Sequence, residues 1–429
     1  MSRGGRKHLI IGCGAAALSA ACRIRKVAPD DEVKLVTKEE HPPYNLAALP
    51  YLISGKTREP DLWQVGEDRL RRAGCSLAKG REVIGLQPEE KQVIYRDGGR
   101  EGYDTLLIAT GSHPVEPDIE GLGEAGFLSF HTLEDCRALQ RRLADGSEMG
   151  VAIYGGGLVA VELAIALLEA GHRVKVIVRS RPLRRYFSED EGSLIETILT
   201  ERGAEIYKGS GIEEARGERG KGAIELALSD GRSLEADLLV AALGVRPATS
   251  FLEGTGIELG KGGGVLVDRR MRTNLEDVYA AGDVAAAPDL FSGSPGLSAI
   301  LPSAIEQGRV AGSNMAGEGI EYEGWVPMNI LNLFGHRTLS IGVQEDGEAQ
   351  VLKEIDRQRR HFKRLVYKDG RLIGAAFLNS DVFPGVVQYL VRKKVEVGKY
   401  AELLLRRPKE TSAWLMLRAE REETLSLEA

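Results

Sequence analysis

The pattern of apolar and polar positions near the start of the chain predicts a strand, a tight turn, a helix and a second strand. The largely apolar segment 8–11 is followed by Gly12-Cys13-Gly14-Ala15-Ala16-Ala17, an alanine-rich stretch and segment 33–37, in which apolar and polar residues are mixed. Short apolar runs bounded by glycine are typical of buried strands, and alanine favours a helix. Glycine lets backbone N–H groups approach a pyrophosphate, which then rests on the positive end of the helix. Alone, the turn is equally compatible with a tight connection that has no ligand.

The same pattern recurs in the middle of the chain. The apolar run 151–154 leads into Gly155-Gly156-Gly157-Leu158-Val159, then into a helical stretch, and segment 173–178 is predicted to form the next strand. Two such units in register predict two dinucleotide-binding sites on one chain. The alternative is that one of the two units has lost its ligand.

Further apolar runs end in small residues at three places. The run 103–108 ends in Ala109-Thr110-Gly111-Ser112, the run 239–244 is followed by Val245-Arg246-Pro247, and 278–281 precedes Gly282-Asp283. The last arrangement puts a carboxylate at the carboxyl edge of a sheet, where ligands bind. The alternative for Asp283 is a helix N-cap, with a helical turn beginning at 284–286. Residues 301–309 predict the start of another helix.

Composition limits the class of protein. The chain has 429 residues, more than one core usually holds, so two to three domains are expected. Apolar residues make up 43%, charged residues 28%, and the net charge is -6, which is typical of a globular protein and argues against a nucleic-acid partner. The basic stretch 2–7 before the apolar run 9–21 superficially resembles a secretory signal, but glycines interrupt the run.

The cysteines are few and far apart. Cys13, Cys22, Cys75 and Cys136 form no C-x-x-C pair, so neither a disulfide framework nor a metal site is predicted. This cysteine usage fits a reducing cytoplasm.

In their order along residues 8 to about 320, these motifs resemble those of the FAD-dependent pyridine nucleotide-disulfide oxidoreductases. This group contains glutathione reductase, coenzyme A disulfide reductase, rubredoxin reductase and NADH oxidase. The resemblance implies an α/β fold with two Rossmann-like, glutathione reductase-like domains and a C-terminal α+β domain. The implied boundaries are an FAD-binding domain at 1–115 and 248–322, an NAD(P)H-binding domain at 116–247, a C-terminal domain for dimerisation or acceptor docking at 323–410, and a helical tail at 411–429.

The resemblance also implies which residues bind the two nucleotides. Expected at the FAD site are Gly12, Gly14, Ala17, Thr37, Lys38, Val83, Ala109, Thr110, Gly111, Gly282, Asp283, Pro302 and Ser303. Expected at the NAD(P)H site are Gly155, Gly157, Leu158, Val159, Glu162, Arg179, Arg185 and Gly244. Glu162 either points towards the junction of the nicotinamide and the flavin or is a carboxylate on the helix surface.

The end of the second strand of each unit bears on nucleotide preference. In the second unit Val178 occupies the usual acidic position, Arg179 comes next and Arg185 follows six residues later. Guanidinium groups can bind the 2′-phosphate of NADPH, which a carboxylate would repel. We therefore expect NADPH rather than NADH, with a solvated arginine-rich turn as the alternative. In the first unit Thr37 stands at the acidic position, and whether it or the following glutamates reach the ribose stays open.

Segment 41–55 should pass beside the flavin, and it resembles the corresponding segment of coenzyme A disulfide reductases. Those enzymes carry a redox-active cysteine where this chain has Ala47. Cys13 is expected to be a small packing residue, so thiol chemistry of the family type is not predicted. Tyr44 and Tyr51 either flank the flavin or are core aromatics, and Tyr44 is a candidate catalytic residue together with Glu162.

The C-terminal part has no glycine turn of this kind. Residues 361–367 and 372–378 around Asp369-Gly370 predict a β-hairpin, 386–391 a helix, and 414–423 a packed terminal helix. The segment resembles the C-terminal domain of rubredoxin reductases and NADH oxidases, which implies dimerisation or acceptor docking.

The expected function is that of an FAD-dependent NAD(P)H oxidoreductase. Hydride passes from the nicotinamide to the flavin, and the electrons then pass to a small carrier such as rubredoxin or ferredoxin, or to a partner redox subunit. One alternative is an NAD(P)H oxidase or a reductase of a small acceptor such as oxygen, a quinone or coenzyme A persulfide. Another is a flavin-binding redox sensor with little turnover. A homodimer is an open alternative, and no membrane span is expected.

Overall fold

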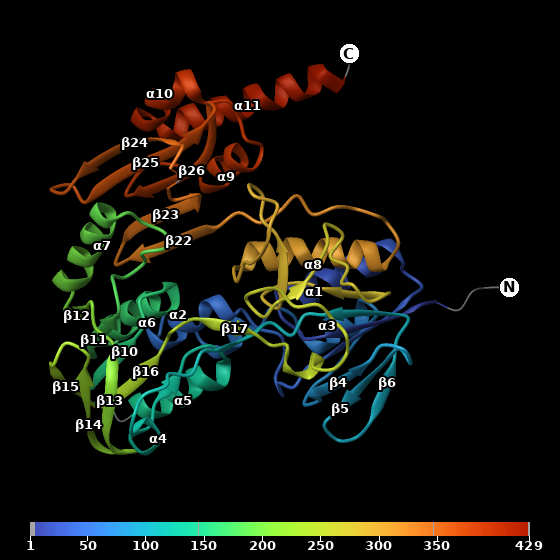
Figure 1. Ribbon diagram of the computed structural model, residues 1–429, viewed down its shortest axis with the longest axis horizontal. Coiled ribbons are helices and arrows are strands. Elements are labelled where there is room, and N and C mark those ends of the chain that lie inside the picture. Colours follow the sequence, from blue (N-terminus) through green and yellow to red (C-terminus); the bar gives the residue numbers. More distant parts are fainter. Residues whose placement is uncertain (1–4, 145, 346, 428–429) are drawn as a thin grey trace. The chain divides into compact units, whose positions relative to one another are not determined.

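A computed structural model describes residues 5–144, 146–345 and 347–427 of the chain (Figure 1). The chain forms two compact units, Met1–Val115 with Val245–Trp325, and Glu116–Gly244 with Val326–Ala429. Each unit is therefore assembled from two separate stretches of sequence. The finer domain boundaries given above stay a prediction.

The first unit is built on a five-stranded parallel sheet in the order β19-β7-β1-β2-β3. Its strands are β1 (Lys7–Ile11), β2 (Glu32–Val36), β3 (Cys75–Ala78), β7 (Thr105–Ile108) and β19 (Val278–Ala280). Residues 8–11 and 105–108 are all buried, which explains why these strands appear in the sequence as continuous apolar runs.

Helices α1 (Ala15–Val27) and α8 (Leu301–Met315) pack against each other at unusually close range. A Cβ atom added to Gly308 would lie 2.1 Å from the backbone oxygen of Ala16, and one added to Gly312 would lie 2.5 Å from that of Ala20. Small residues on both helices therefore allow backbone contact between segments almost 300 positions apart, and they fix α8 against the first βα unit.

The remaining elements of the first unit are short. They are the antiparallel strands β4 (Val83–Gln87), β5 (Gln92–Tyr95) and β6 (Arg100–Gly102), the pair β8 (Ser112–Pro114) and β17 (Val245–Pro247), the strands β18 (Val265–Leu266), β20 (Ala285–Pro288) and β21 (Pro295–Leu297), and the helices α2 (Leu49–Ile53) and α3 (Glu67–Arg72).

The proposed helical turn after Asp283 is wrong. The buried alanines that follow it form β20, which pairs with β18 and β21 and so satisfies its backbone groups in a sheet.

The second unit contains another five-stranded parallel sheet, in the order β12-β11-β10-β16-β9. Its strands are β9 (Leu128–Ser129), β10 (Gly150–Tyr154), β11 (Arg173–Val178), β12 (Ala204–Lys208) and β16 (Leu238–Ala241). The other elements of this part are the helices α4 (Leu122–Ala125), α5 (Leu133–Leu143), α6 (Leu158–Glu169) and α7 (Glu189–Glu201), and the antiparallel strands β13 (Ile212–Glu218), β14 (Lys221–Leu228) and β15 (Ser233–Ala236).

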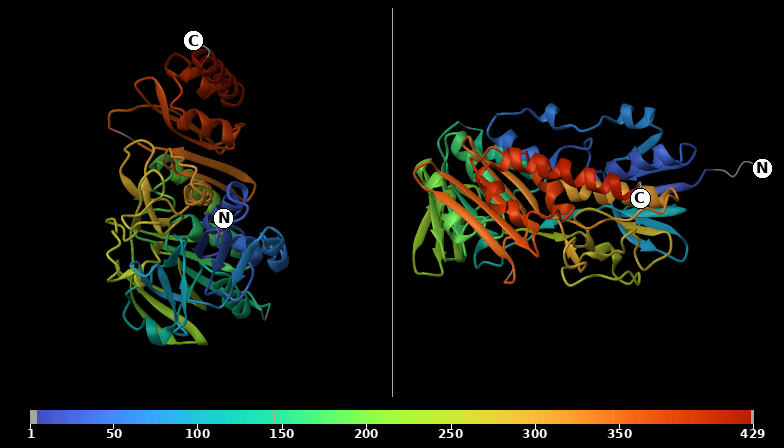
Figure 2. Two further views of the ribbon diagram at one scale, coloured as in Figure 1. Left: turned by 90° about the vertical axis from the view of Figure 1, so that its right-hand side faces the viewer. Right: turned by 90° about the horizontal axis from the view of Figure 1, so that it is seen from above.

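The C-terminal part of this unit is an antiparallel sheet in the order β22-β23-β26-β25-β24. Its strands are β22 (Met328–Leu333), β23 (His336–Gly342), β24 (Gln350–Asp356), β25 (His361–Lys368) and β26 (Arg371–Leu378). The predicted hairpin is confirmed, with Asp369 at φ 50° and Gly370 at φ 74°, as a type I′ turn requires. Helices α9 (Pro384–Arg392) and α10 (Ala401–Arg406) cover one face, and α7 packs on the other (Figures 1 and 2).

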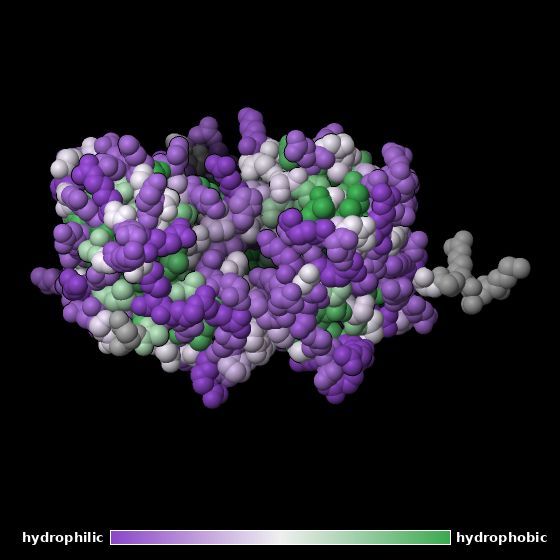
Figure 3. All heavy atoms as spheres, turned by 90° about the horizontal axis from the view of Figure 1, so that it is seen from below, coloured by the Kyte–Doolittle hydropathy of each residue, from purple (hydrophilic) through white to green (hydrophobic). Residues whose placement is uncertain are grey.

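The chain ends in helix α11 (Pro408–Leu427), which contacts α9 and α10. Leu415 is buried and Leu417 is 61% exposed, so the predicted terminal helix packs along one side only. Polar and charged residues dominate the face in Figure 3, with hydrophobic residues in small separate patches. In the described ranges, every helix is too short or too polar to cross a membrane.

Candidate functional site

The first glycine turn joins β1 to α1 and has the geometry of a phosphate-binding turn. Gly12 adopts φ 116°, and a Cβ there would lie 2.1 Å from the backbone oxygen of Ala109, so only glycine fits. Gly14 is the N-cap of α1, has open space where a Cβ would be, and provides no side-chain cap. The first turn of α1 contains no acidic residue. Uncapped N–H groups with room in front of them fit a pyrophosphate.

The second glycine turn, between β10 and α6, repeats this geometry. Gly155 adopts φ 143°, and a Cβ there would lie 2.1 Å from the backbone oxygen of Ala242. Gly157 caps α6 without a side-chain hydrogen bond and, like Gly14, has open space beside it. Both turns therefore fit the phosphates of a dinucleotide for the same two reasons, a forced glycine at the bend and an open helix N-terminus.

Polar groups meet at the carboxyl edge of the first sheet. Ser112 Oγ donates a hydrogen bond to Asp283 Oδ2 at 3.0 Å, and Thr110 Oγ1 donates to the backbone oxygen of Ala248 at 2.9 Å. Gly282 N donates to the buried side chain of Gln307 at 2.8 Å. The Nε2 atom of Gln307 is buried and has no hydrogen-bond partner in the part of the chain that the structure describes. An unpaired buried donor beside Asp283 fits a bound polar group there.

Sequence reasoning missed Gln307. The signal was a polar residue on the inner face of a helix whose neighbours there, Ala304 and Ala311, are small and apolar. A glutamine in such a position needs partners, and one of them is the amide before Asp283.

The N-terminus of α8 carries the predicted pair Pro302 and Ser303. The helix begins at Leu301 after Ile300, which provides no side-chain cap, and its first turn contains no acidic residue. Ser298 Oγ donates to Ser303 Oγ at 3.0 Å. The open positive end of this helix can stabilise negative charge on a bound group.

Several residues expected near the FAD are buried. Thr37 is buried, and its Oγ1 accepts a hydrogen bond from Glu39 N at 3.2 Å. Val83 packs in the hydrophobic core of the first unit. Tyr44 is 9% exposed and its hydroxyl donates to Glu39 Oε1 at 3.3 Å, whereas Tyr51 is 47% exposed. Tyr44 is thus buried among neighbours and Tyr51 is the accessible aromatic of the segment.

The chain belongs to a known family. Residues 6–310 match the family model described as pyridine nucleotide-disulphide oxidoreductase, and residues 327–381 match that of the rubredoxin NAD+ reductase C-terminal domain. The protein is a pyridine nucleotide-disulphide oxidoreductase. The predicted α/β fold with two Rossmann-like domains and a C-terminal α+β domain is confirmed. As in its family, the cofactor is FAD, the co-substrate is NAD(P)H, and the enzyme is an oxidoreductase.

Three relatives illustrate the range of this family. The chain is 34% identical over 91% of its length to NADH-dependent phenylglyoxylate dehydrogenase subunit epsilon of Aromatoleum evansii, covering 92% of that protein. It is 30% identical over 81% of its length to the CoA-dependent NAD(P)H sulfur oxidoreductase of Pyrococcus furiosus, covering 78% of that protein. The same fold occurs in an engineered water-forming NADPH oxidase bound to NADPH, which was derived from a Lactobacillus brevis NADH oxidase. The TM-score is 0.86 at 23% identity, and the match covers 98% of this chain and 100% of that one.

Of the four cysteines, Cys13, Cys75 and Cys136 are buried and Cys22 is exposed. Burial raises the pKa of the Cys13 thiol to about 11, and the same cause raises that of Cys75 to about 11. Both thiols are therefore protonated at neutral pH and unreactive. Ala47 lies exposed in a short turn, where its amide donates to Asn45 Oδ1 at 3.2 Å.

The arginine-rich segment after β11 divides into exposed and anchored side chains. Arg179, Arg184 and Arg185 are exposed. Arg181 instead turns inward, and its Nη2 donates to the backbone oxygen of Phe187 at 2.6 Å. Val178, at the usual acidic position, is buried at the end of the strand. The segment therefore presents positive charge and no carboxylate directly after the strand.

Glu162 lies partly buried on α6, one turn after the second glycine turn. Burial raises the pKa of its carboxyl to about 7. Both interpretations of Glu162, as a carboxylate near the nicotinamide–flavin junction or as one on the helix surface, stay predictions, and the partial burial of its side chain favours the first.

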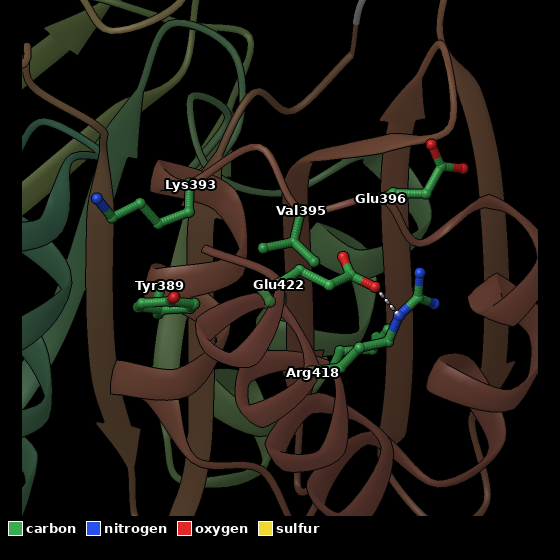
Figure 4. A pocket seen from close by; sticks show the side chains of 8 residues that line it. Tyr389, Lys393, Val395, Glu396, Arg418 and Glu422 are labelled. Atoms are coloured by element: carbon green, nitrogen blue, oxygen red, sulfur yellow. Dashed lines mark hydrogen bonds and ion pairs between the residues drawn. The ribbon is translucent and has the colours of Figure 1, made fainter. Parts of the chain in front are cut away.

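A separate surface pocket of about 250 Å³ lies in the C-terminal part, beside α9 and α11 (Figure 4). Arg418 Nε donates to Glu422 Oε1 at 2.8 Å beside it, so the charges there are internally paired. None of the predicted nucleotide-binding residues lines this pocket. Among the described residues there is also no cluster of side chains suited to a metal ion.

Proposed function

We propose that this enzyme oxidises NADPH and passes the electrons to a protein acceptor, either a small redox carrier or a partner redox subunit. The observation that carries the proposal is the exposed Ala47 in the segment where thiol-using relatives have a cysteine, together with buried, protonated Cys13. With alanine at position 47, thiol chemistry of the family type has no sulfur at the position where those relatives carry it.

The chain's own residues bind and orient the nucleotides in this proposal. The open N-termini of α1 and α6 hold the two pyrophosphates, and Asp283, fixed by Ser112, holds the polar chain of FAD. Bound FAD supplies the capacity to accept a hydride and to release its electrons one at a time. The protein contributes orientation and exclusion of water.

The exposed Arg179 and Arg185 support NADPH as the donor. Among its five substitutions, the engineered NADPH oxidase has an aspartate replaced by alanine, arginine and then serine placed directly after it, and a second arginine six positions beyond the first. This chain has Val178, Arg179, Ser180 and Arg185 with the same spacing. Two guanidinium groups can bind a phosphate through charge-assisted hydrogen bonds, each contributing about 1.5–3 kcal/mol.

NADH is the second candidate donor, because the relative from Aromatoleum evansii is named as NADH-dependent. The name of that relative also supports a partner subunit as the acceptor, since it denotes one subunit of a dehydrogenase. The match of residues 327–381 to a rubredoxin reductase domain supports a small carrier instead. Both acceptors are proteins.

Stopped-flow reduction of the bound flavin tests the donor. We expect NADPH to reduce the enzyme at least tenfold more efficiently than NADH, which corresponds to about 1.4 kcal/mol. Arg179→Glu should abolish this preference, because the carboxylate would repel the 2′-phosphate that the arginine attracts. Arg184→Glu, an equally exposed arginine of the same segment, is the matched control and should keep the preference. Faster reduction of the parent by NADH would reject the NADPH assignment.

Steady-state turnover tests the acceptor. We expect slow NADPH oxidation in air and with coenzyme A persulfide, and fast turnover with a one-electron dye or an added carrier protein. Fast turnover with oxygen or the persulfide alone would replace the proposal with direct reduction of a small acceptor.

A further inference from the structure

A buried ion pair connects the C-terminal sheet to the helix that follows the arginine-rich segment. Arg364 on β25 and Glu191 on α7 are 3% and 0% exposed, and Arg364 Nε donates to Glu191 Oε1 at 2.9 Å. Glu191 Oε2 in turn accepts a hydrogen bond from Ser188 N at 2.8 Å. The carboxylate of Glu191 therefore links Arg364 to Ser188, the last residue of segment 179–188.

The same guanidinium also holds the segment directly. Arg364 Nη2 donates to the backbone oxygen of Tyr186 at 3.3 Å, and Arg364 Nη1 donates to the backbone oxygen of Gln344. Ser340 Oγ, on strand β23 of the same sheet, donates to the same Tyr186 oxygen at 3.0 Å. Two strands of the C-terminal sheet thus converge on one carbonyl next to Arg185.

Contacts within the segment connect Tyr186 to the second glycine turn. Tyr186 N donates to the backbone oxygen of Leu183 at 2.9 Å, and Leu183 N donates to that of Gly156 at 2.7 Å. The ring of Phe187 packs edge-on against Phe362 of β25 with 5.7 Å between centroids. A continuous series of contacts therefore runs from Arg364 through the arginine-rich segment to the turn expected to bind the nicotinamide nucleotide.

We propose that Arg364 is a positioning residue that fixes segment 179–188 so that Arg179 and Arg185 are ordered before NADPH binds. The inference rests on the proposed function, since it concerns recognition of the 2′-phosphate. Its physical basis is that a loop ordered in advance does not lose conformational entropy on binding. Because Glu191 neutralises the charge of Arg364, Arg364 does not attract the nucleotide itself. It acts by fixing the position of the segment.

Three variants of the FAD-loaded enzyme isolate this role. Arg364→Lys keeps a positive charge opposite Glu191 but cannot make all three contacts, and Ser340→Ala removes only one hydrogen bond to Tyr186. Arg360→Lys is the matched control, because Arg360 pairs with Glu201 at the far end of α7 and also joins the C-terminal sheet to that helix. Titration calorimetry with 2′,5′-ADP and with 5′-AMP separates phosphate recognition from binding of the rest of the nucleotide.

We expect Arg364→Lys to weaken 2′,5′-ADP binding by roughly three- to tenfold and 5′-AMP binding by less than about twofold, with a smaller effect of the same kind from Ser340→Ala. Arg360→Lys should change neither. Equal weakening of both nucleotides by Arg364→Lys would overturn the proposal, as would unchanged binding of 2′,5′-ADP.

Limited trypsin digestion separates failure of this inference from failure of the proposed function. Trypsin can cut after Arg179, Arg184 and Arg185, and Pro182 protects the bond after Arg181. Arg364→Lys should speed cleavage within the segment several-fold relative to the parent and Arg360→Lys. A parent that binds 2′,5′-ADP and 5′-AMP equally would reject the NADPH preference alone, and unchanged cleavage in Arg364→Lys would reject the positioning role alone.

Discussion

Glu162 shows how the environment of one residue changes its chemistry. Its carboxyl has a pKa of about 7 instead of 4.5 because burial penalises the charged form. Between these values the folded protein binds more protons than the unfolded chain, so stability falls as pH rises through this window. The full penalty is present above pH 7, where the carboxylate is charged.

We therefore predict that Glu162→Gln stabilises the enzyme at alkaline pH. Relative to the parent, the free energy of unfolding should rise by about 2–3 kcal/mol at pH 8.5 and by much less at pH 5. Urea denaturation of the FAD-loaded protein at both pH values measures the difference. Glu169→Gln, at the exposed end of the same helix, is the matched control. A difference that is constant across pH would contradict the assigned cause.

At the scale of elements, helices α1 and α8 of the first unit approach each other backbone to backbone. We predict that Gly308→Ala destabilises this unit by about 1–3 kcal/mol, since its new methyl group would meet the backbone oxygen of Ala16 and force the helices apart. Thermal unfolding, together with the amount of FAD retained after purification, measures the effect. Gly123→Ala, in helix α4 with open space at the Cβ position, should be neutral or slightly stabilising. Equal effects of both variants would argue against helix contact as the cause.

The elements that sequence predicts well are those whose signals are local. Both strand–glycine–helix units and the hairpin around Asp369-Gly370 are encoded within about 30 residues each, by apolar runs and forced glycines. The expectation of a helical turn after Asp283 is wrong because β20 consists of three alanines and a proline, which have little strand preference, and forms a strand through pairing with β18 and β21. The half-exposed strand β24 lacks an apolar run and was missed for a similar reason.

At the scale of the whole molecule, contacts between distant parts of the chain were beyond prediction. Arg364 and Glu191 are 173 positions apart, and each alone has the sequence appearance of a surface residue. The candidate site divides in the same way. Its glycines and Asp283 could be proposed from the sequence. The contacts of Gln307 and of Arg181 could not, because they depend on neighbours that only the fold supplies.

The division into two compact units predicts how the molecule unfolds. Arg364→Met leaves the buried carboxylate of Glu191 without its positively charged partner, which should cost about 3–5 kcal/mol. Because both residues belong to the unit formed by Glu116–Gly244 and Val326–Ala429, we expect calorimetry to show a lower transition for that unit only. The FAD-containing unit should unfold at an unchanged temperature. A common downward shift of all transitions would mean that the two units unfold together.

The alanine at position 47 also sets how many electrons the enzyme can store. A flavin accepts two electrons, and a redox-active disulfide or sulfenate beside it would accept two more. Cys13 and Cys75 are buried with raised pKa values and cannot take that part. With alanine at position 47, the flavin takes up the electrons of one hydride, and under the proposed function the next nucleotide is oxidised only after the acceptor has removed them. When the acceptor is scarce, its supply then limits the rate at which the enzyme oxidises the nucleotide.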